Sequence, residues 1–89
     1  EIDQGAEMAL ETGKSLLPVG VRAVEGSFDK GELISIVSKS GDVIGKGMTN
    51  FSDLEIEIIK GLKTSEIKSK LGYLTTNEII HRDNLVLTK

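Results

Sequence analysis

Apolar residues recur at helical spacing near the start of the chain. Asp3 is a favourable N-cap, and the residues that follow it place an apolar stripe on one side of a helix. That stripe consists of Ala6, Ala9 and Leu10. Gly13 suits the position after the helix, because glycine adopts positive φ without steric cost. The pattern therefore predicts a helix near residues 4–12.

A second helix is predicted in the second half of the chain. Ser52 and Glu55, three residues apart, form the pattern of a capping box, which indicates a helix near residues 52–61. Its apolar stripe comprises Leu54, Ile58, Ile59 and Leu62. We expect this stripe to face the core. The alternative is that part of it contacts another domain or another subunit.

A third and shorter helix follows. Thr64 or Ser65 is the expected cap of a helix near residues 65–71. Ile67 and Leu71 lie four residues apart and therefore share one face. Gly72 stands just beyond the last apolar position, where glycine commonly ends a helix.

Strand patterns fill the region between the first two helices. Pro18 stops a helix, and residues 19–25 then alternate between apolar and polar, which predicts a strand. One face of this strand would carry Val19, Val21 and Ala23, and the other would carry Arg22. Leu33–Val37 is apolar at nearly every position, so we expect a strand that is covered on both faces.

The remaining strands are shorter. A hairpin-type turn at residues 40–42 leads into a predicted strand over residues 43–49. Gly45 and Gly47 lie within that strand, where glycine marks a bulge or a close approach of another backbone. Residues 78–80 and 85–87 are two further short strands, separated by a charged break.

This order of elements bounds the fold. One helix, three strands, two short helices and terminal strands predict a protein that is mainly β with short helices. The turn signals recur every eight to twelve residues, which favours a small barrel over a doubly wound sheet. At 89 residues, the chain is expected to form a single domain over 1–89 with one core.

Composition narrows the classes of function. The absence of cysteine excludes disulfides and thiolate metal sites within this chain. No apolar run approaches the roughly 20 residues of a membrane span, and no signal-peptide pattern opens the chain. The formal net charge is −3, and the aromatic residues are one Tyr and two Phe. Nucleic-acid binders usually carry a basic excess and stacking aromatics, so this balance argues against tight nucleic-acid binding.

One short motif imitates a nucleotide-binding loop. Gly13-Lys14-Ser15 matches the end of the P-loop motif G-x-x-x-x-G-K-[ST]. The first glycine of that motif would fall at residue 8, which is Met8. The preceding residues also read as a helix, whereas a P-loop follows a strand. The motif therefore does not predict phosphate chemistry.

A second motif imitates a protein-kinase catalytic loop. His81-Arg82-Asp83 resembles its H-R-D sequence, but the later metal-binding Asn position holds Thr88. His81 is the only histidine, and zinc needs three or four protein ligands, so a structural or surface role is favoured over a metal site. We expect Arg82 and Asp83 to form an ion pair or to cap the break between the last strands. No catalytic or metal-binding residue is predicted.

Several segments resemble the PUA fold, a β-pseudobarrel flanked by short helices. The segments that carry this general resemblance are Gly5-Ala6, Leu17-Pro18-Val19-Gly20-Val21, Phe28 with Gly31, Gly41, and Ile44-Gly45-Lys46-Gly47. Further segments narrow the resemblance to the C-terminal PUA domain of bacterial glutamate 5-kinases. These are Gly13-Lys14-Ser15-Leu16-Leu17-Pro18-Val19-Gly20-Val21, Glu66-Ile67, Leu71-Gly72-Tyr73, and His81-Arg82-Asp83-Asn84-Leu85-Val86-Leu87.

The resemblance implies a longer, cytoplasmic parent with an upstream amino-acid-kinase domain. That domain would use ATP and Mg²⁺ to phosphorylate the side-chain carboxylate of glutamate, the first step of proline synthesis. Its catalytic and feedback-inhibitor residues would all lie outside this chain, so this fragment would need no cofactor. The implied partners are its own kinase domain and other subunits, with no membrane contact.

The resemblance also implies a candidate RNA-binding loop. Other PUA modules bind RNA through the loop after the first helix and the adjoining strands, which here corresponds to residues 13–17. The candidate RNA-binding residues are Gly13, Lys14, Ser15, Leu16 and Arg22. The competing interpretation is a solvated turn and an exposed strand arginine, which the acidic net charge favours. Two functions therefore stay open: a regulatory or assembly module of a kinase, and an RNA-binding module.

Overall fold

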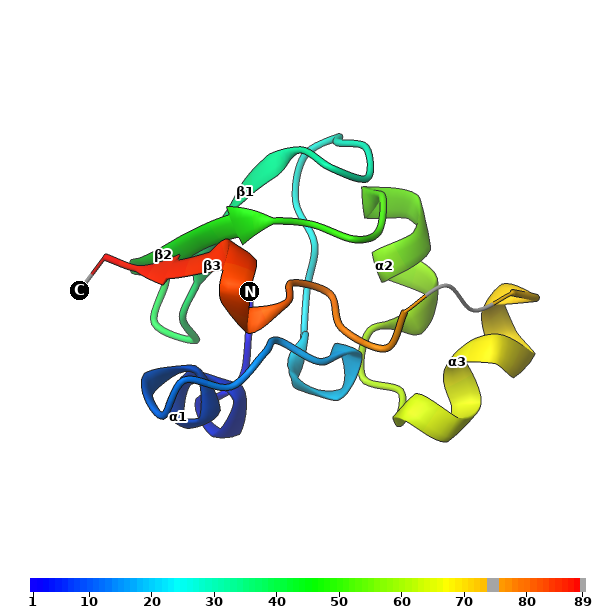
Figure 1. Ribbon diagram of the computed structural model, residues 1–89, viewed down its shortest axis with the longest axis horizontal. Coiled ribbons are helices and arrows are strands. Elements are labelled where there is room, and N and C mark those ends of the chain that lie inside the picture. The colour runs from blue at the N-terminus through cyan, green and yellow to red at the C-terminus, as the bar shows by residue number, and fades with distance from the viewer. Residues whose placement is uncertain (74–75, 89) are drawn as a thin grey trace.

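A three-stranded antiparallel sheet forms one side of the molecule (Figure 1). The computed structural model describes residues 1–73 and 76–88. The sheet order is β1 (Leu33–Val37), β2 (Val43–Met48) and β3 (Leu85–Leu87). Leu33 pairs with Met48, and the register shifts between Ile36 and Val37. The β1–β2 hairpin, the turn at residues 40–42 and the strand at Leu85–Leu87 are thereby confirmed, with β2 ending one residue earlier than expected.

Three α-helices begin at capped positions. In α1 (Gln4–Glu11), the Asp3 carboxylate accepts a hydrogen bond from the Ala6 N–H at 2.8 Å. In α2 (Asp53–Ile59), the Glu55 N–H donates to the Ser52 hydroxyl at 3.2 Å, and the Ser52 N–H donates to Glu55 Oε1 at 2.8 Å. This reciprocal pair is the predicted capping box.

The cap expected for the third helix is wrong by one or two residues. Helix α3 (Thr64–Leu71) begins at Thr64, and its N-cap is Lys63. Lys63 has extended backbone angles, and its N–H donates to Glu66 Oε1 at 3.3 Å. Thr64 is therefore already helical and cannot act as the cap. Gly72 ends the helix with a φ of +90°, as the sequence predicted.

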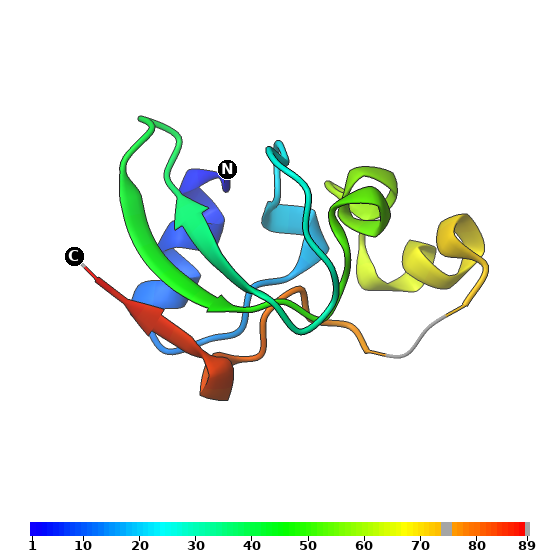
Figure 2. The same cartoon turned by 90° about the horizontal axis from the view of Figure 1, so that it is seen from above.

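The core lies between the sheet, the helices and the loops that join them (Figure 2). Twelve buried residues form it: Ile2, Leu10, Leu16, Val21, Ile36, Ile44, Phe51, Ile56, Ile59, Ile67, Ile79 and Ile80. This one cluster draws residues from the three α-helices, from β1 and β2, from the N-terminal segment and from the segment before β3. Among the described residues, no helix has the length and apolar character of a membrane span.

The N-terminal residues bond to the rest of the fold from the start of the chain. The Ile2 N–H donates to the Val37 carbonyl oxygen at 2.9 Å, and Ile2 forms an isolated antiparallel bridge with Val21. The Arg22 N–H donates to the Glu1 carbonyl oxygen at 2.9 Å. The first residues of the chain thus lie between β1 and the segment after residue 20.

The strand predicted over residues 19–25 is wrong. Pro18 begins a single 3₁₀ turn, η1 (Pro18–Gly20), in which the Val21 N–H donates to the Pro18 carbonyl oxygen at 3.0 Å. Proline favours the first position of such a turn because its fixed φ is already helical. Beyond η1, only Val21 forms a bridge, and its partner is the short N-terminal segment. The alternation of apolar residues was real, but no partner strand lies beside it in the part of the chain that the structure describes.

Two other expectations about pairing and burial are wrong. Residues 78–80 form no regular strand, and only Ile80 makes an isolated bridge, to Leu16. Strand β1 is covered on one face only, because Leu33 is 66% exposed while Ile36 is buried. The outer face of β1 is open to solvent at Leu33.

The apolar stripe predicted for the second helix is partly wrong. Ile59 is fully buried and Leu62 is half-buried, but Leu54 and Ile58 are exposed to solvent. Ile56 takes the core position instead. Apolar residues stand on both sides of α2, so helical periodicity alone does not identify the buried side.

Gly47 allows a close crossing of backbones, as the sequence predicted. A Cβ atom at Gly47 would lie 2.6 Å from Ile80 Cγ2 and 2.7 Å from the Asn84 carbonyl oxygen. Gly45 makes a similar approach to the Val86 carbonyl oxygen, at 2.8 Å. Both positions let the C-terminal segment lie directly on β2.

Gly47→Ala should therefore destabilise the domain. Overpacking at a rigid backbone contact costs about 1–3 kcal/mol. The expected result is a lower midpoint of urea unfolding with an unchanged slope. The control is Gly5→Ala, since Gly5 lies in α1 and a Cβ there would meet no atom closer than 3.5 Å. An unfolding midpoint for Gly47→Ala equal to that of the control would contradict the crossing.

Candidate functional site

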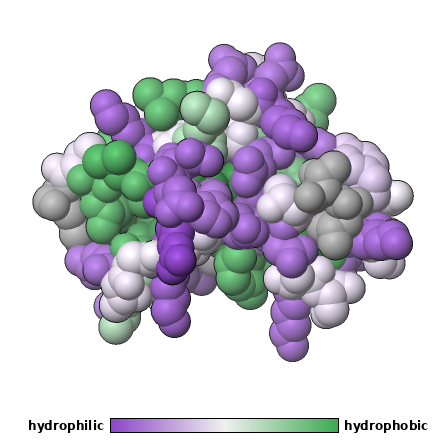
Figure 3. Space-filling view, viewed as in Figure 1, coloured by the Kyte–Doolittle hydropathy of each residue, from purple (hydrophilic) through white to green (hydrophobic). Residues whose placement is uncertain are grey.

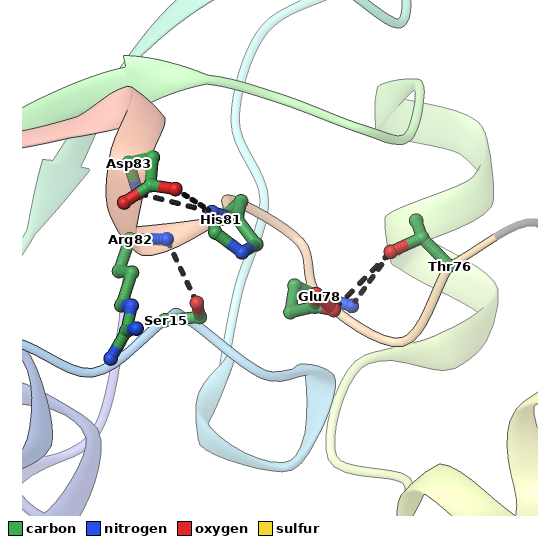
Figure 4. Close-up of polar contacts among 6 residues, drawn as sticks. All are labelled: Ser15, Thr76, Glu78, His81, Arg82 and Asp83. Atoms are coloured by element: carbon green, nitrogen blue, oxygen red, sulfur yellow. Dashed lines mark hydrogen bonds and ion pairs between the residues drawn. The ribbon is translucent and has the colours of Figure 1, made fainter.

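The loop after α1 is joined to the segment before β3 (Figure 4). The Leu16 N–H donates to the Ile80 carbonyl oxygen at 3.0 Å, and the Ile79 N–H donates to the Leu16 carbonyl oxygen at 2.7 Å. The Ser15 hydroxyl accepts from the Arg82 N–H at 2.8 Å. The structure therefore brings together two segments that are far apart in the sequence.

The candidate residues of the loop have different accessibilities. Gly13 has a φ of +85°, and the space where its Cβ would lie is open, so glycine is needed there for the turn and not for a close contact. Lys14 is exposed and Ser15 is half-buried. Leu16 is only 4% exposed, so its side chain belongs to the core and offers no surface to a ligand.

Most backbone amides of this loop are already occupied. The Gly13 N–H donates to the Leu10 carbonyl oxygen at 3.0 Å, and the Lys14 N–H donates to the Ala9 carbonyl oxygen at 3.1 Å. The Leu16 N–H is taken by Ile80. These three amides close the end of α1 and the bridge to Ile80, so they are not directed at a ligand.

Arg22 makes its contacts at the N-terminus. Its Nε atom lies 3.9 Å from Glu1 Oε2, and more than half of its side chain is exposed. An ion pair of this length at the surface contributes little to stability. No hydrogen bond or ion pair within the described chain joins Arg22 to the loop at residues 13–16.

The structure adds Arg82 to the loop. Its N–H bonds to Ser15, and its side chain extends past Ser15 in Figure 4. No local pattern predicts this neighbour, because 67 residues separate the two positions. Lys14 and Arg82 thus place two cations on this part of the surface.

Carboxylates stand on the same segment as Arg82. His81 caps a 3₁₀ turn, η2 (Arg82–Asn84), by accepting at Nδ1 from the Asp83 N–H at 3.1 Å. Asp83 Oδ2 lies 3.5 Å from the same Nδ1 atom, and no ion pair joins Arg82 to Asp83 among the described residues. Of the two expected roles of Arg82 and Asp83, the ion pair is therefore wrong. Glu78 bonds to Thr76 close by in Figure 4. The surface is therefore of mixed charge.

The aromatic residues do not form a platform for bases. Phe51 is 1% exposed, and Phe28 is half-buried against the core. Tyr73 is exposed, and its hydroxyl donates to the Glu55 carboxylate. Stacking of successive bases requires exposed rings near one another, and this arrangement does not supply them.

A second surface lies on α2. Leu54 is 73% exposed and Ile58 is 52% exposed, and the two are one helical turn apart on the same side. Tyr73 also stands exposed beside this helix, bonded to Glu55. We call Leu54, Ile58 and Tyr73 the α2 surface. On the sheet, Leu33, Met48 and Val86 are also exposed, and Figure 3 shows hydrophobic side chains in separate patches.

The hydrogen bond between Glu55 and Tyr73 shifts the pKa values of both residues. The largest single influence on the pKa of Glu55 is burial, which disfavours the charged carboxylate and so raises the pKa. Hydrogen bonds from Tyr73 and Ser52 and the positive charge of Lys30 lower this pKa. Together they outweigh the effect of burial and hold the pKa of Glu55 below its ordinary value. The same hydrogen bond to Glu55 raises the pKa of Tyr73. Among the described residues, no group of three carboxylates or histidines is placed to hold a metal ion.

The comparisons with known proteins agree on one family. A family model described as the PUA domain matches residues 1–71. The chain is 56% identical over 86 residues to the glutamate 5-kinase of Aquifex aeolicus. The aligned region covers 97% of this chain and 24% of that protein. It is 53% identical over 87 residues to the glutamate 5-kinase of Dictyoglomus thermophilum, with coverage of 97% and 24%. The chain thus spans about a quarter of the length of these curated relatives.

Solved structures share the fold. A PUA domain from Aeropyrum pernix K1, solved as a tartrate complex, superposes with a TM-score of 0.65 at 22% identity, covering 90% of this chain and 39% of that one. A conserved PUA domain protein from Thermoplasma acidophilum gives a TM-score of 0.60 at 25% identity, covering 90% and 45%. The predicted PUA-like β-pseudobarrel is therefore confirmed.

The contact between Glu55 and Tyr73 should make stability depend on pH in a defined direction. The folded pKa of Glu55 is lower than its unfolded value, so its contribution is present above the ordinary glutamate pKa of about 4.3 and is lost as pH falls through the folded pKa. Glu55→Gln should cost about 1 kcal/mol of unfolding free energy at neutral pH, and less at pH 3. Urea unfolding of both proteins at several pH values measures this.

The alkaline side has the opposite sign. The folded pKa of Tyr73 is raised, so its contribution is present below the ordinary tyrosine pKa and is lost as pH rises through the folded pKa. Tyr73→Phe is the matched variant, and its stability difference from the parent should vanish at high pH. Stability differences that do not change with pH for either variant would show that the contact does not form.

Proposed function

The chain belongs to the PUA domain family, and we propose that it is the non-catalytic C-terminal PUA module of a glutamate 5-kinase. The observation that carries this proposal is the match to glutamate 5-kinases along 97% of this chain at 56% and 53% identity. The chain spans about a quarter of those relatives, which leaves room for a separate kinase domain. In the parent, that domain would transfer the γ-phosphoryl group of ATP to the side-chain carboxylate of glutamate in proline synthesis, in the cytoplasm.

ATP and Mg²⁺ would be held by the kinase domain and not by this chain. The residues here do not fit a nucleotide site, because the amides of Gly13, Lys14 and Leu16 bond to the chain's own carbonyl groups. The spacing of the motif that ends at Ser15 also departs from a P-loop. No catalytic step is therefore assigned to any residue of this domain.

The role of the module is regulation or assembly through protein contacts. The α2 surface supports this role, since Leu54 and Ile58 expose neighbouring apolar side chains, and contiguous apolar patches mark interaction sites. The polar atoms of Tyr73 and Glu55 lie at its border, as in the polar rim of a protein interface. The partner would be the kinase domain of the same chain or another subunit.

RNA binding is the second candidate function. The observation that favours it is that the exposed Lys14 precedes Ser15, which accepts a hydrogen bond from the Arg82 N–H, in the loop through which other PUA modules bind RNA. Against it stand the net charge of −3, the buried Phe51 and the carboxylates of Glu78 and Asp83 on the same chain segment as Arg82. These features support weak binding at most.

The absence of catalytic residues predicts that the 89-residue chain alone shows only background ATP turnover with glutamate, while a protein that joins it to the kinase domain should be active.

The role in assembly predicts that α2 is protected in the longer protein. In the joined protein, Leu54→Ser with Ile58→Ser should speed amide hydrogen exchange of α2 by at least about tenfold, or 1.4 kcal/mol, because the covering contact is lost.

The matched control for that experiment is Leu33→Ser in the joined protein. Leu33 is 66% exposed on β1, which is a different element from α2, so its substitution should leave exchange in α2 unchanged. Glutamate-dependent turnover by the 89-residue chain alone would contradict the assignment of the chemistry. Equal exchange in α2 with and without the kinase domain would contradict the α2 contact.

The RNA alternative predicts a specific salt dependence. If RNA binds at the loop, Lys14→Ala should weaken it and reduce the slope of log K against log salt by about one unit, since one phosphate contact is lost. We expect binding of a short single-stranded RNA at physiological salt to be too weak to saturate at micromolar concentrations. Lys39→Ala, at an exposed lysine in the β1–β2 hairpin, is the control. Tight binding lost only with Lys14→Ala would favour the RNA-binding function.

A further inference from the structure

A cleft lies between β1 and the segment that was expected to pair as a strand. Its volume is about 660 Å³, within the roughly 300–1,000 Å³ of ligand pockets. β1 forms one wall and residues 23–28 form much of the other. In Figure 2 the segment after residue 21 runs beside β1 on the side away from β2. The cleft therefore occupies the place next to the free edge of the sheet.

Both walls carry backbone groups without partners in the described chain. β1 is an edge strand, since the sheet order is β1-β2-β3. Apart from its pairing with β2, the backbone bond of β1 is the one from Ile2 to Val37, at one end of the strand. Across the cleft, residues 24–27 form no backbone hydrogen bond with the rest of the described chain. An edge strand of this kind is a template for an added strand.

The floor of the cleft is apolar. Val24, Phe28 and Ile34 are half-buried and line it, so each presents part of its side chain to the opening. Ile2, Val21 and Ile36 lie beneath them in the core. An extended chain that entered here would place every second side chain on this floor.

The rim of the cleft is acidic. Among the described residues that line it, Glu1, Glu25 and Glu32 are charged, and none is a lysine, arginine or histidine. Glu1 lies 3.9 Å from Arg22 and its α-amino group donates to Ala23, while the Glu32 carboxylate accepts from the Asp29 N–H. The carboxylate of Glu25 forms no ion pair within residues 1–73 and 76–88, so the rim keeps negative charge. This charge disfavours nucleic acid and favours a cationic ligand.

We propose that this cleft binds an extended peptide segment of a partner protein by strand addition to β1. The segment alternates apolar side chains, which pack on Val24, Phe28 and Ile34, with lysine or arginine side chains, which lie at Glu25 and Glu32. A strand residue rises about 3.3 Å, so five or six peptide residues match the five-residue length of β1. The cleft shares with the loop at residues 13–17 only the buried side chain of Leu16, and Leu54, Ile58 and Tyr73 of the α2 surface do not line it.

The test uses the ¹⁵N-labelled 89-residue chain and the capped hexapeptide of sequence KVKVKV. We expect saturable chemical-shift changes confined to residues 22–28, to β1 and to Ile2. The capped hexapeptide EVEVEV should bind at least about tenfold more weakly, because the rim repels it. A KVKVKV peptide that is N-methylated at alternate residues should also lose at least about tenfold, because strand addition needs its N–H groups.

Two variants of the protein locate the site. Glu25→Gln should weaken KVKVKV binding severalfold and leave the spectrum of the free protein otherwise intact, whereas Glu57→Gln on α2 should have no effect. Ala23→Phe, which fills the cleft from its wall, should abolish binding, and its own spectrum shows whether the fold is kept. Absence of saturable shifts with KVKVKV, equal binding of EVEVEV, or shifts that map outside the cleft would each overturn the proposal.

Discussion

The contact of Ile80 and Asn84 with Gly47 is the constraint on which the rest of the structure depends. It allows the segment before β3 to cross directly over β2, at a distance that any side chain at residue 47 would prevent. Ile80 is fully buried by this crossing, and its backbone bonds to Leu16 in the loop after α1. One glycine thus joins the sheet, the C-terminal segment and the N-terminal helix in a single core.

The local features could be predicted from the sequence because each has a local cause. Asp3 and Ser52 cap their helices through bonds to residues three positions away, and the turn at residues 40–42 depends on a glycine with positive φ. The close approach at Gly47 was also predictable, since glycine weakens a strand and is kept in its interior mainly where a bulge or a neighbouring backbone requires it.

The partners of each segment could not be predicted in the same way. Residues 19–25 alternate like a strand, but whether they pair depends on which segment lies beside them. Within this range the N-terminal residues bond only to residues 20–23. In α2, apolar residues occupy both sides, so the choice of Ile56 over Leu54 for the core depends on how the helix docks. At the loop, the bond from Arg82 to Ser15 joins residues with no local relation. The residue types of the candidate site were visible in the sequence, whereas their neighbours were set by tertiary packing.

The contacts of Glu1 and Ile2 have a mechanical consequence. Both residues bond to the body of the domain, through Val37, Val21 and Arg22, so a polypeptide attached before Glu1 would leave the surface with a fixed direction and no slack. Such an attachment would keep a fixed orientation relative to the domain. A rotation or pull applied upstream would be transmitted to β1 and to the wall of the cleft beside it, because Ile2 bonds to the one and lines the other.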